Sequence, residues 1–524
     1  MKILNSAQMN EIDRRTIESG IPGLILMENA AMRVVELIEE KFSPLSERRV
    51  VVVCGRGNNG GDGLAIARQL WSRFRPKSMH VLLTTASGDL NKDAAANFKM
   101  LQASGCPNLI QGPLAAPPVE ARFADLLIDA VLGTGVNGPA SGIPLEAIQM
   151  INTQFPVAKV VSVDVPSGLP TDSGALLGEF VRADYTVTFT AYKLGQVLSP
   201  AGDHMGELRL GAIGTPPEMI GDDAALNIRL ITPRWIAPLF APRAKDANKG
   251  NYGHVLIVAG SRGKSGAAAM AGMAALRAGA GLVTVATTES AMPAVAAHAP
   301  ELMTEPLPET ESGGMAEHAF AFIEQYSEGK NIVAVGPGVG RHPETVKVVR
   351  KMYRELPNTL VIDADGLNAL AGGDWKGSGT PRILTPHPGE MGRLTGKPTS
   401  AIQEDRVGTA RNFASAVAAQ VVLKGHRTLL AIPGGDVYVN PTGSPAMATG
   451  GTGDILTGLI AGLLAQKEDP IAIAAAVYLH GLSGEIGARH VGEQALTATD
   501  LLRYFPDAIR EMAARTAAIS SGLM

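Results

Sequence analysis

The order of apolar and polar segments restricts this chain of 524 residues to one broad architecture. In both halves, short β-branched runs that end in polar or glycine-rich turns alternate with alanine-rich segments of helical length. This alternation is typical of parallel sheets covered by helices on both faces. The chain is too long for one ordinary domain. We therefore expect an α/β protein of two domains.

Strands and helices are expected at regular intervals along each half. The first half begins with a helical region at 13–42, interrupted at 20–23, and continues with strands at 49–54, 79–84, 126–131, 159–163 and 185–189. The second half has strands at 254–260, 282–287, 332–338, 359–366, 382–387 and 420–425. Between 214 and 249 the rhythm is lost and prolines gather, which indicates a linker and the entry to the second domain.

Composition narrows the classes of partner and compartment. The formal net charge of −4 gives no excess of positive charge for binding phosphate backbones, so we expect no nucleic-acid partner. The only two cysteines, Cys54 and Cys106, favour a reducing compartment, and Cys54 is interpreted as a buried apolar residue at a strand end. No secretory signal is visible, and the apolar run after Asp454 is too short to span a bilayer. We expect a soluble, cytoplasmic homo-oligomer without a membrane partner.

The sequence TGGTGDILTG at 449–458 is the strongest chemical motif of the second half. Its glycines permit positive φ, so that backbone N–H groups can converge on an anion. The apolar run that follows predicts a buried helix whose positive N-terminal end faces the same anion. Asp454 would then be a base held beside a bound phosphate, as deprotonation of a hydroxyl during phosphoryl transfer requires.

Four other strand ends of the second half carry polar or glycine-rich turns. The turn GPGVG at 336–340 exposes backbone N–H groups, and DADGLN at 363–368 offers carboxylates for hydrated Mg²⁺ or a substrate hydroxyl. The turn TPHPGE at 385–390 holds His387, and Lys424 could meet a nucleotide phosphate. Because open α/β sheets bind ligands at the carboxyl ends of their strands, these residues are candidates for one site.

These motifs resemble a known family. LTPHPGE at 384–390, DADGLN and ATGGTGDILTG at 448–458 are similar to the ADP- or ATP-dependent NAD(P)H-hydrate dehydratases of the ribokinase-like superfamily, as are 249–253 and 260–267. The resemblance implies phosphorylation of the C6 hydroxyl of hydrated NAD(P)H, with Mg²⁺ and ADP or ATP, and then elimination of phosphate. It implies that Asp454 is the base and that the 450–453 amides stabilise the phosphoryl group. The implied hydrate contacts are Ala267, Gly338, His387 and Asp454, and the implied nucleotide contacts are Lys424, Gly425, His426, Arg427, Thr428 and Gly453.

The first half has its own set of strand-end motifs. NNGGDG at 58–63 follows a strong strand and opens a helix, so it could hold a pyrophosphate, although it does not match GxGxxG. Asp129 ends a second strand and DVPSG at 164–168 ends a third. The oxygens of Asn59, Asp129 and Ser167 would suit a weakly held monovalent cation, whereas Asp129 and Asp164 could equally cap turns.

With LMENAA at 26–31, this set resembles the NAD(P)H-hydrate epimerase domain, which has a Rossmann-like α/β/α sandwich fold. The resemblance implies exchange of the R and S hydrates at C6 and K⁺ bound by Asn59, Asp129 and Ser167. Asp164 is our choice for the acid/base. The implied hydrate contacts are Asn58, Asn59, Gly60, Gly61, Asp62, Gly133, Thr134, Gly135, Val136, Asn137, Gly138, Pro139 and Asp164.

The expected organisation is an epimerase domain at 1–214, a linker at 215–230 and a ribokinase-like α/β/α dehydratase domain at 231–510. One alternative is a kinase for a sugar or vitamin precursor, fused to a Rossmann-like binding module. In another, the first domain has kept the fold without turnover. The choices between ADP and ATP and between the NADH and NADPH hydrates stay open.

Overall fold

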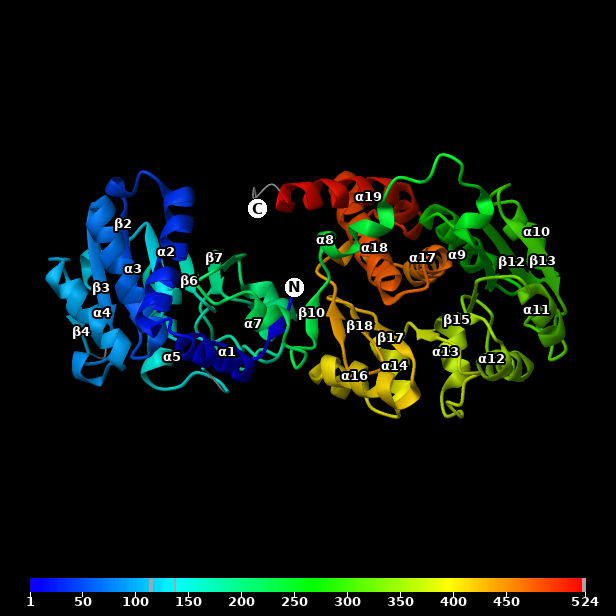
Figure 1. Cartoon of the computed structure of the whole chain (residues 1–524), viewed down its shortest axis with the longest axis horizontal. Coiled ribbons are helices and arrows are strands. Elements are labelled where there is room, and N and C mark those ends of the chain that lie inside the picture. The colour runs from blue at the N-terminus through cyan, green and yellow to red at the C-terminus, as the bar shows by residue number, and fades with distance from the viewer. Residues whose placement is uncertain (113–115, 136–137, 521–524) are drawn as a thin grey trace. The chain divides into compact units, whose positions relative to one another are not determined.

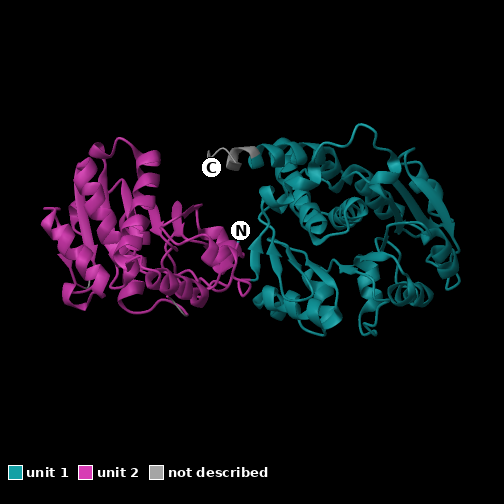
Figure 2. Cartoon of the chain, in the orientation of Figure 1, with its two compact units in different colours: residues 1, 227–524 teal, residues 2–226 magenta. Residues whose placement is uncertain are grey.

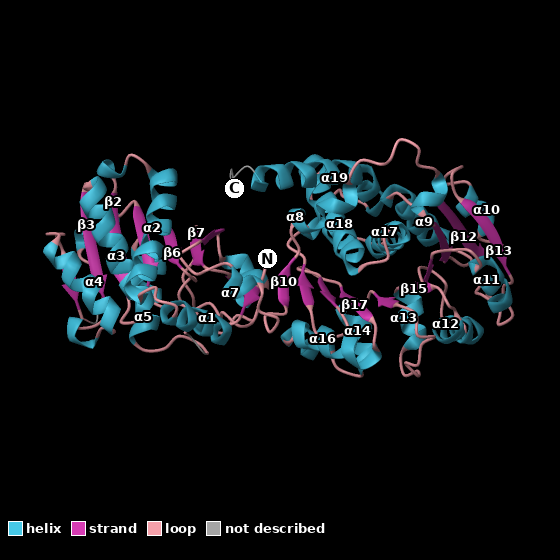
Figure 3. Ribbon diagram, viewed as in Figure 1, coloured by secondary structure: helices cyan, strands magenta, loops and turns pink. Residues whose placement is uncertain are grey.

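The computed structural model describes residues 1–112, 116–135 and 138–520 (Figure 1). The chain divides into two compact units (Figure 2). We call Lys2–Leu226 the N-terminal unit; the C-terminal unit is Asn227–Met524 with Met1. Both units consist of helices packed on a sheet (Figure 3). The α/β fold predicted from the alternation of segments is confirmed.

The N-terminal unit is built on a seven-stranded parallel sheet of order β4-β3-β2-β5-β6-β7-β9. The strands are β2 (Arg49–Cys54), β3 (Ser78–Leu83), β4 (Leu109–Gln111), β5 (Leu126–Ala130), β6 (Lys159–Val163), β7 (Tyr185–Phe189) and β9 (Glu207–Gly211). The helices are α1 (Ser6–Glu18), α2 (Gly23–Phe42), α3 (Asn58–Phe74), α4 (Lys92–Ala103), α5 (Ile143–Gln154), α6 (Leu194–Val197) and α7 (Glu218–Gly221). The strand order reverses between β2 and β5, the place where open sheets of this kind bind ligands.

Alternate residues of β2 show how the sheet is covered. Val50 and Val52 pack with α2, α3 and α4, whereas Val51 and Val53 pack with α5 on the other face. The side chains of successive strand residues point to opposite faces, so a fully buried strand is apolar throughout. The run VVVVC therefore requires helices on both faces.

The N-terminal unit also has a second sheet, of two strands. Strand β1 (Ile3–Leu4) pairs in parallel with β8 (Tyr192–Lys193), with Leu4 opposite Lys193. Both β1 residues are fully buried. This pairing fixes the start of α1, whose N-terminus is capped by Asn5. The predicted interruption of the leading helical region is confirmed between α1 and α2, but the first helix begins at Ser6 because of that cap.

The C-terminal unit has a ten-stranded sheet of order β10-β19-β18-β17-β16-β15-β14-β11-β12-β13. The strands are β10 (Ile228–Leu230), β11 (His254–Val258), β12 (Leu282–Thr288), β13 (Met303–Leu307), β14 (Ile332–Val335), β15 (Thr359–Ile362), β16 (Arg382–Leu384), β17 (Gln420–Leu423), β18 (Leu429–Ala431) and β19 (Val437–Val439). Only β18 is antiparallel to its neighbours. All six strands predicted for this half are present.

Two groups of helices cover the faces of this sheet. Helices α8 (Pro233–Ile236), α9 (Ser265–Ala278), α17 (Thr452–Gln466), α18 (Pro470–Val491) and α19 (Ala498–Ser520) share one core with residues of the sheet. Helices α11 (Ala319–Ser327), α12 (Pro343–Glu355), α13 (Ala364–Leu370) and α14 (Pro388–Thr395) share the other. Val295 of α10 (Met292–Ala296) adds to the first core and Val417 of α16 (Arg406–Val417) to the second, and the unit also contains α15 (Thr399–Glu404).

Two glycines of α17 allow it to lie directly against α9. A Cβ atom at Gly458 would be 2.0 Å from the carbonyl oxygen of Ala271, and one at Gly462 would be 2.5 Å from that of Ala275. Neither distance is compatible with a side chain, so glycine is required for this approach. The contact fixes α17, and with it the motif at its N-terminus.

The segment expected as a linker, 215–230, is part of the two folded units. Residues 215–226 belong to the N-terminal unit, where Met219 and Ile220 of α7 pack against Leu226, and β10 pairs with β19 of the C-terminal unit. Leu226 and Ile228 are buried. The prolines nearby interrupt helices without preventing these few apolar residues from packing.

Helix α18 is long and apolar enough to cross a membrane by length and composition, but 78% of its most apolar window is buried inside the protein. A helix that is apolar on all sides is expected in the core of a large domain. Burial within the C-terminal unit accounts for its composition.

Candidate active sites

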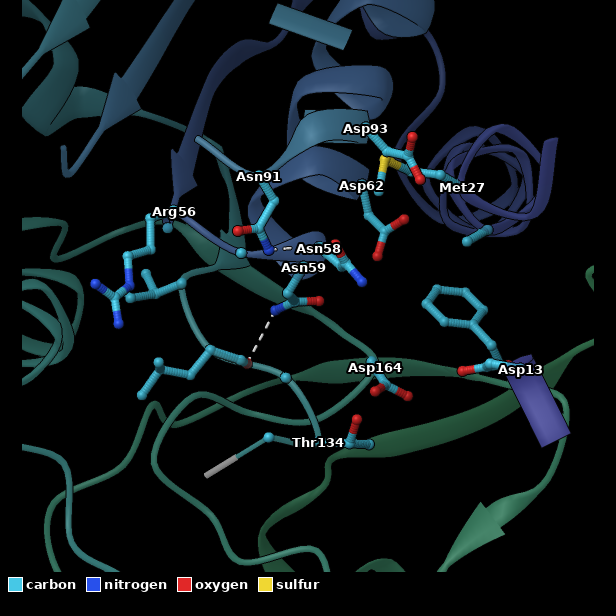
Figure 4. Close-up of a pocket in the computed structure, with 18 of the residues that line it drawn as sticks. Asp13, Met27, Arg56, Asn58, Asn59, Asp62, Asn91, Asp93, Thr134 and Asp164 are labelled. Atoms are coloured by element: carbon cyan, nitrogen blue, oxygen red, sulfur yellow. Dashed lines mark hydrogen bonds between the residues drawn. The ribbon is translucent and has the colours of Figure 1, made fainter. Parts of the chain in front are cut away.

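A pocket of about 790 Å³ lies at the carboxyl ends of β2, β5 and β6 in the N-terminal unit (Figure 4). Helices α1 and α2 complete its wall. The predicted residues that line it are Asn58, Asn59, Asp62, Gly133, Thr134, Gly135 and Asp164. Seven residues from three separate motifs therefore come together at the reversal of strand order.

The other predicted residues of this site lie elsewhere. Gly60 and Gly61 are buried in the first turn of α3, where a Cβ at Gly60 would be 1.8 Å from the carbonyl oxygen of Gly55. Gly60 allows the helix to pack against the loop after β2, and Gly61 allows it to pack against Met27 of α2 and Ala94 of α4. Gly138 and Pro139 are not among the lining residues, and Val136 and Asn137 lie outside the described residues.

Asp164 is held in an unusual backbone conformation by several contacts. Its φ of +66° lies in the left-handed region, which non-glycine residues rarely adopt. Its amide donates to the carbonyl of Val187 at 2.7 Å, and Gln196 Nε2 donates to its carbonyl at 2.7 Å. Lys193 Nζ donates to its Oδ1 at 2.6 Å. The contacts fix the carboxyl group at the pocket wall.

Lys193 was not anticipated from the sequence. Its ammonium is 1% exposed and also donates to Thr188 Oγ1 at 2.8 Å and to the carbonyl of Phe189 at 3.0 Å. It thus fixes Asp164 by an ion pair and has its three protons in hydrogen bonds. Lys193 reaches the site through the pairing of β1 with β8, and nothing in its local sequence indicates that contact.

Two further carboxyl groups face the same pocket. Asp62 extends from α3 and Asp13 from α1 (Figure 4). Burial, with the charge of Asp164, raises the pKa of Asp62 well above its usual range. Burial also raises the pKa of Asp13 to about 6, although Lys193 opposes the shift. Asp13 was not singled out in the sequence because it lies within an ordinary amphipathic helix.

Asp129, Asn59 and Ser167 form a buried cluster beside the pocket. Asp129 is fully buried and accepts from Ser167 Oγ at 2.6 Å, Ser162 Oγ at 2.8 Å and the Ser167 amide at 2.9 Å. Burial raises its pKa, and no lysine or arginine in the described ranges pairs with it. Asn59 Nδ2 donates to the carbonyl of Leu132 at 2.9 Å, while the buried Asn59 Oδ1 has no partner there. The Leu132 carbonyl also accepts from Ser167 Oγ at 3.3 Å, which links Asn59 to Asp129 through Ser167. An amide oxygen without a partner and a carboxylate without a cationic partner are groups that a monovalent cation could bind.

In the C-terminal unit, Asp454 lies in the first turn of α17, as predicted. Gly451 caps this helix with φ of +97°. The first N–H groups of a helix have no partner within it, so they are available to an anion. Burial and the neighbouring Asp363 raise the pKa of Asp454 to about 6. This carboxyl can therefore accept and release a proton near neutral pH.

Lys424 is the common neighbour of the acidic groups at this site. Its Nζ is 2.5 Å from Asp363 Oδ1 and 3.8 Å from Glu390 Oε2. Burial alone would lower the pKa of Lys424, but Asp363 and Glu390 outweigh it and raise the pKa. A Cβ at Gly453 would be 3.5 Å from Lys424 Nζ, so the ammonium lies beside the N-terminal turn of α17.

The acidic motif DADGLN differs from the expected open set of metal ligands. Asp363 accepts from Lys424 and, through Oδ2, from Thr457 Oγ1 at 2.8 Å. Asp365 accepts from Lys264 Nζ at 3.3 Å, Arg341 Nε at 3.2 Å and the Gly340 amide at 3.1 Å. Both carboxylates are thus engaged by protein donors and hold neighbouring loops together.

The remaining predicted residues lie on turns around the same strand ends. His387 caps α14 by accepting from the amides of Gly389 and Glu390, and burial with nearby Lys424 lowers its pKa. Gly338 and Ala267 are in contact, because a Cβ at Gly338 would be 3.1 Å from Ala267 Cβ. In the 424–428 turn, Thr428 Oγ1 donates to the Gly425 carbonyl at 2.9 Å, and Arg406 Nη1 donates to that of His426 at 2.5 Å.

The two sheets and their strand-end sites are typical of an α/β enzyme with two sites, one of which has a carboxyl group at a helix N-terminus, as phosphoryl transfer requires. Comparison with protein families gives the same division. A family model described as NAD(P)H-hydrate dehydratase matches residues 255–507, and one described as YjeF-related protein N-terminus matches 23–195.

Similar proteins match almost the whole chain. The bifunctional NAD(P)H-hydrate repair enzyme Nnr of Moorella thermoacetica is 41% identical over 521 residues, which cover 98% of this chain and 97% of that protein. The protein of the same name from Thermofilum pendens is 38% identical, with coverage of 98% and 97%. The ADP/ATP-dependent NAD(P)H-hydrate dehydratase of Bacillus subtilis, co-crystallized with ATP and Mg²⁺, is 33% identical, with coverage of 55% of this chain and 99% of that one and a TM-score of 0.49.

This chain belongs to the family of bifunctional NAD(P)H-hydrate repair enzymes. The resemblance stated from the motifs is confirmed, for both halves of the chain. The match of each half to its own family model also agrees with the two units of the structure.

Proposed function

We propose that the chain restores hydrated NADH and NADPH by two reactions at two sites. The N-terminal unit exchanges the R and S epimers at C6, and the C-terminal unit dehydrates the S epimer with ADP or ATP. Asp454 at the N-terminus of α17, beside Lys424, is the observation that carries the dehydratase assignment. A soluble cytoplasmic location and a homo-oligomeric state belong to the same proposal.

In the dehydratase reaction, Asp454 takes the proton of the C6 hydroxyl as its oxygen attacks the terminal phosphoryl group. The amides at 450–453 and the N-terminus of α17 stabilise the charge on that group. Phosphate then leaves C6 with the bonding electrons while a proton leaves C5, which restores the C5=C6 double bond. The products are NAD(P)H and phosphate, with AMP from ADP or ADP from ATP.

The 424–428 turn and Gly453 are proposed to bind the nucleotide, and Ala267, Gly338 and His387 the hydrate. The engaged carboxylates of Asp363 and Asp365 leave Mg²⁺ to be held mainly by the nucleotide phosphates, whose charge it would shield. Lys424 lies beside Gly453 of the N-terminal turn of α17, so its ammonium would contact and orient the same phosphates.

In the N-terminal unit, the pocket-lining motif residues are proposed to bind the hydrate. Asp164 is proposed as an acid/base. Asn59, Asp129 and Ser167 are proposed to hold K⁺, because Asn59 Oδ1 is unpartnered among the described residues and Asp129 lacks a cationic partner there. A bound K⁺ would supply positive charge near the substrate pyrophosphate and fix the loops after β2, β5 and β6.

The first test is recovery of reduced-nicotinamide absorbance from mixed NADH-hydrate epimers with Mg²⁺ and ADP or ATP. Recovery of the whole pool, faster than spontaneous epimerisation allows, is expected. A stall with one epimer left would limit the N-terminal unit to binding. A stable phosphorylated product without free phosphate would instead favour the small-molecule kinase. Replacing K⁺ with Na⁺ or a tetraalkylammonium ion tests the cation proposal on the epimer exchange alone.

A further inference from the structure

The pocket of the N-terminal unit contains more carboxyl groups than its cations neutralise. Asp13, Asp62 and Asp164 come from three different elements, and the ion pairs of the described residues link only Asp164 to a lysine, Lys193. The other charged residues that line the pocket are Arg56 and Asp93. A site that must accept a dinucleotide with phosphate groups would repel it if all these carboxyls were ionised. At least one of the three is therefore expected to carry a proton.

Of these three carboxyl groups, Asp13 is the one with a buried oxygen, Oδ1, that lacks a hydrogen bond among the described residues. A buried polar atom without a partner is costly, and such atoms are retained where a ligand supplies the missing contact. Figure 4 shows the Asp13 carboxyl in the same part of the pocket as those of Asp62 and Asp164.

The position of Asp13 is fixed by the fold and linked to Lys193. The helix that carries it, α1, follows β1 after one residue, and Leu4 of β1 pairs with Lys193. Met9, Ile12 and Thr16 bury the inner face of the helix. Asp13 is therefore held by a packed helix, next to an element that also holds the ion-paired Asp164.

We propose that Asp13 is the second proton-transfer residue of the epimerisation, working with Asp164 on the two faces of C6. This inference rests on the proposed epimerase function. A proton donor must hold its proton and a proton acceptor must be ionised. Burial raises the pKa of Asp13 to about 6, which favours its protonated form, whereas the ion pair with Lys193 favours the ionised form of Asp164. Environments that separate two carboxyl groups in this way assign one as acid and the other as base.

The proposed step is balanced in atoms and charge. Asp13 gives its proton to the C6 hydroxyl, the C–O bond breaks with its electrons, and water leaves as the ring nitrogen forms a C6=N iminium. Asp164 then takes a proton from a water molecule whose oxygen adds to the opposite face of C6. One proton has moved from Asp13 to Asp164 and one water has been exchanged. The reverse turnover, or exchange with solvent, restores the starting state.

The test uses the full-length chain with one pure epimer and no nucleotide, so that the dehydratase does not act. Epimer exchange is followed by chromatography for the wild type, Asp13→Asn and the control Glu11→Gln. Glu11 lies on the same helix but is half exposed and paired with Arg14. We expect Asp13→Asn to lower kcat about 100-fold or more, with KM within about threefold, because general acid–base groups contribute that much. Its pH profile should also lose the limb near pH 6.

Two outcomes would overturn the inference. One is an Asp13→Asn variant, folded by circular dichroism, with the kcat and pH profile of Glu11→Gln. The other is retention of the original C6 oxygen when the wild type inverts the hydrate in ¹⁸O-water, because the step requires one solvent oxygen per inversion. This second measurement does not depend on the folding of any variant. If the wild-type chain did not exchange the epimers at all, the epimerase function itself would be refuted, and this result is distinct from the two that overturn the role of Asp13.

Discussion

At the residue scale, the dehydratase mechanism that we propose depends on one carboxyl group at the start of a helix. Asp454 has a raised pKa and lies in the first turn of α17, directly after the glycine turn. Asp454→Asn keeps the size of the side chain and removes the base. We expect dehydration of the S epimer to fall about 1,000-fold or more, while epimer exchange without nucleotide is unchanged. Absorbance recovery measures the first and chromatography the second.

The matched control is Asp507→Asn, which makes the same change at a partly exposed position of α19 in the same unit. It should dehydrate the hydrate at the wild-type rate. Wild-type turnover by Asp454→Asn would show that another group removes the hydroxyl proton.

The pH dependence of dehydration follows from the same residue. Asp454 must be ionised to act as a base, and its pKa is about 6, so kcat should fall as the pH decreases below 6. The pKa is raised from 3.8, so between pH 6 and 4 the folded chain binds this proton and the unfolded chain does not. Protonation of Asp454 therefore stabilises the fold in that window. It lowers the activity by removing the base and not by unfolding the chain. Stopped-flow rates at pH 5–8 with circular dichroism at each pH check this; a flat profile to pH 5 would contradict it.

At the scale of elements, the site depends on the close contact of α17 with α9. Gly458→Ala would place a Cβ 2.0 Å from the carbonyl oxygen of Ala271 and force the helices apart. We expect the free energy of unfolding to fall by about 1–3 kcal/mol or more, as for other overpacked cores, and dehydratase activity to fall with it. Denaturant unfolding of the C-terminal unit measures the change.

Gly266→Ala is the control, since a Cβ at this position of α9 has no heavy atom within 4 Å. It should leave the free energy of unfolding unchanged or raise it slightly, because alanine favours helices over glycine. Equal stability of the two variants would mean that α17 can move without cost.

The elements also show what the sequence could predict. A strand such as β2 lies inside the sheet, is apolar after its first residue Arg49, and has the bounds predicted from the sequence. The edge strands β4 and β9 are half exposed and were missed, because a strand with one neighbour needs no continuous apolar run. The short β10 was interpreted as linker for the same reason.

The sites divide in a similar way. Asp129 lies near the end of a strand, Asp164 follows one and Asp454 opens a helix, so the local sequence places all three at the carboxyl edge of a sheet. Asp13 and Lys193 reach the pocket through the pairing of β1 with β8, two residues in each strand. Such a short contact between segments far apart in the chain leaves no pattern that periodicity can detect. The role of Gly60 and Gly61 in packing likewise depends on tertiary contacts.

At the scale of the whole molecule, each candidate site is formed by residues of a single unit. Chains with one defective site should therefore complement one another in solution. We expect Asp454→Asn and Asp164→Asn chains, neither of which alone clears a mixed pool faster than spontaneous epimerisation allows, to do so when mixed with nucleotide and Mg²⁺. Absorbance recovery should reach the wild-type end point at a rate that rises with the concentration of each chain. Failure of the mixture would mean that the hydrate must be passed within one chain.

The pairing of β1 with β8 has a consequence for biosynthesis. A ribosome delivers the N-terminus first, so Ile3 and Leu4 emerge nearly the whole unit earlier than their partners Tyr192 and Lys193. Strands β2 to β6 can assemble in the meantime, but the first helix has no fixed place until the partner strand arrives. The pocket is thus expected to be completed only when the last part of the unit has been translated. A nascent chain stalled before residue 192 would contain most of the sheet and no epimerase site.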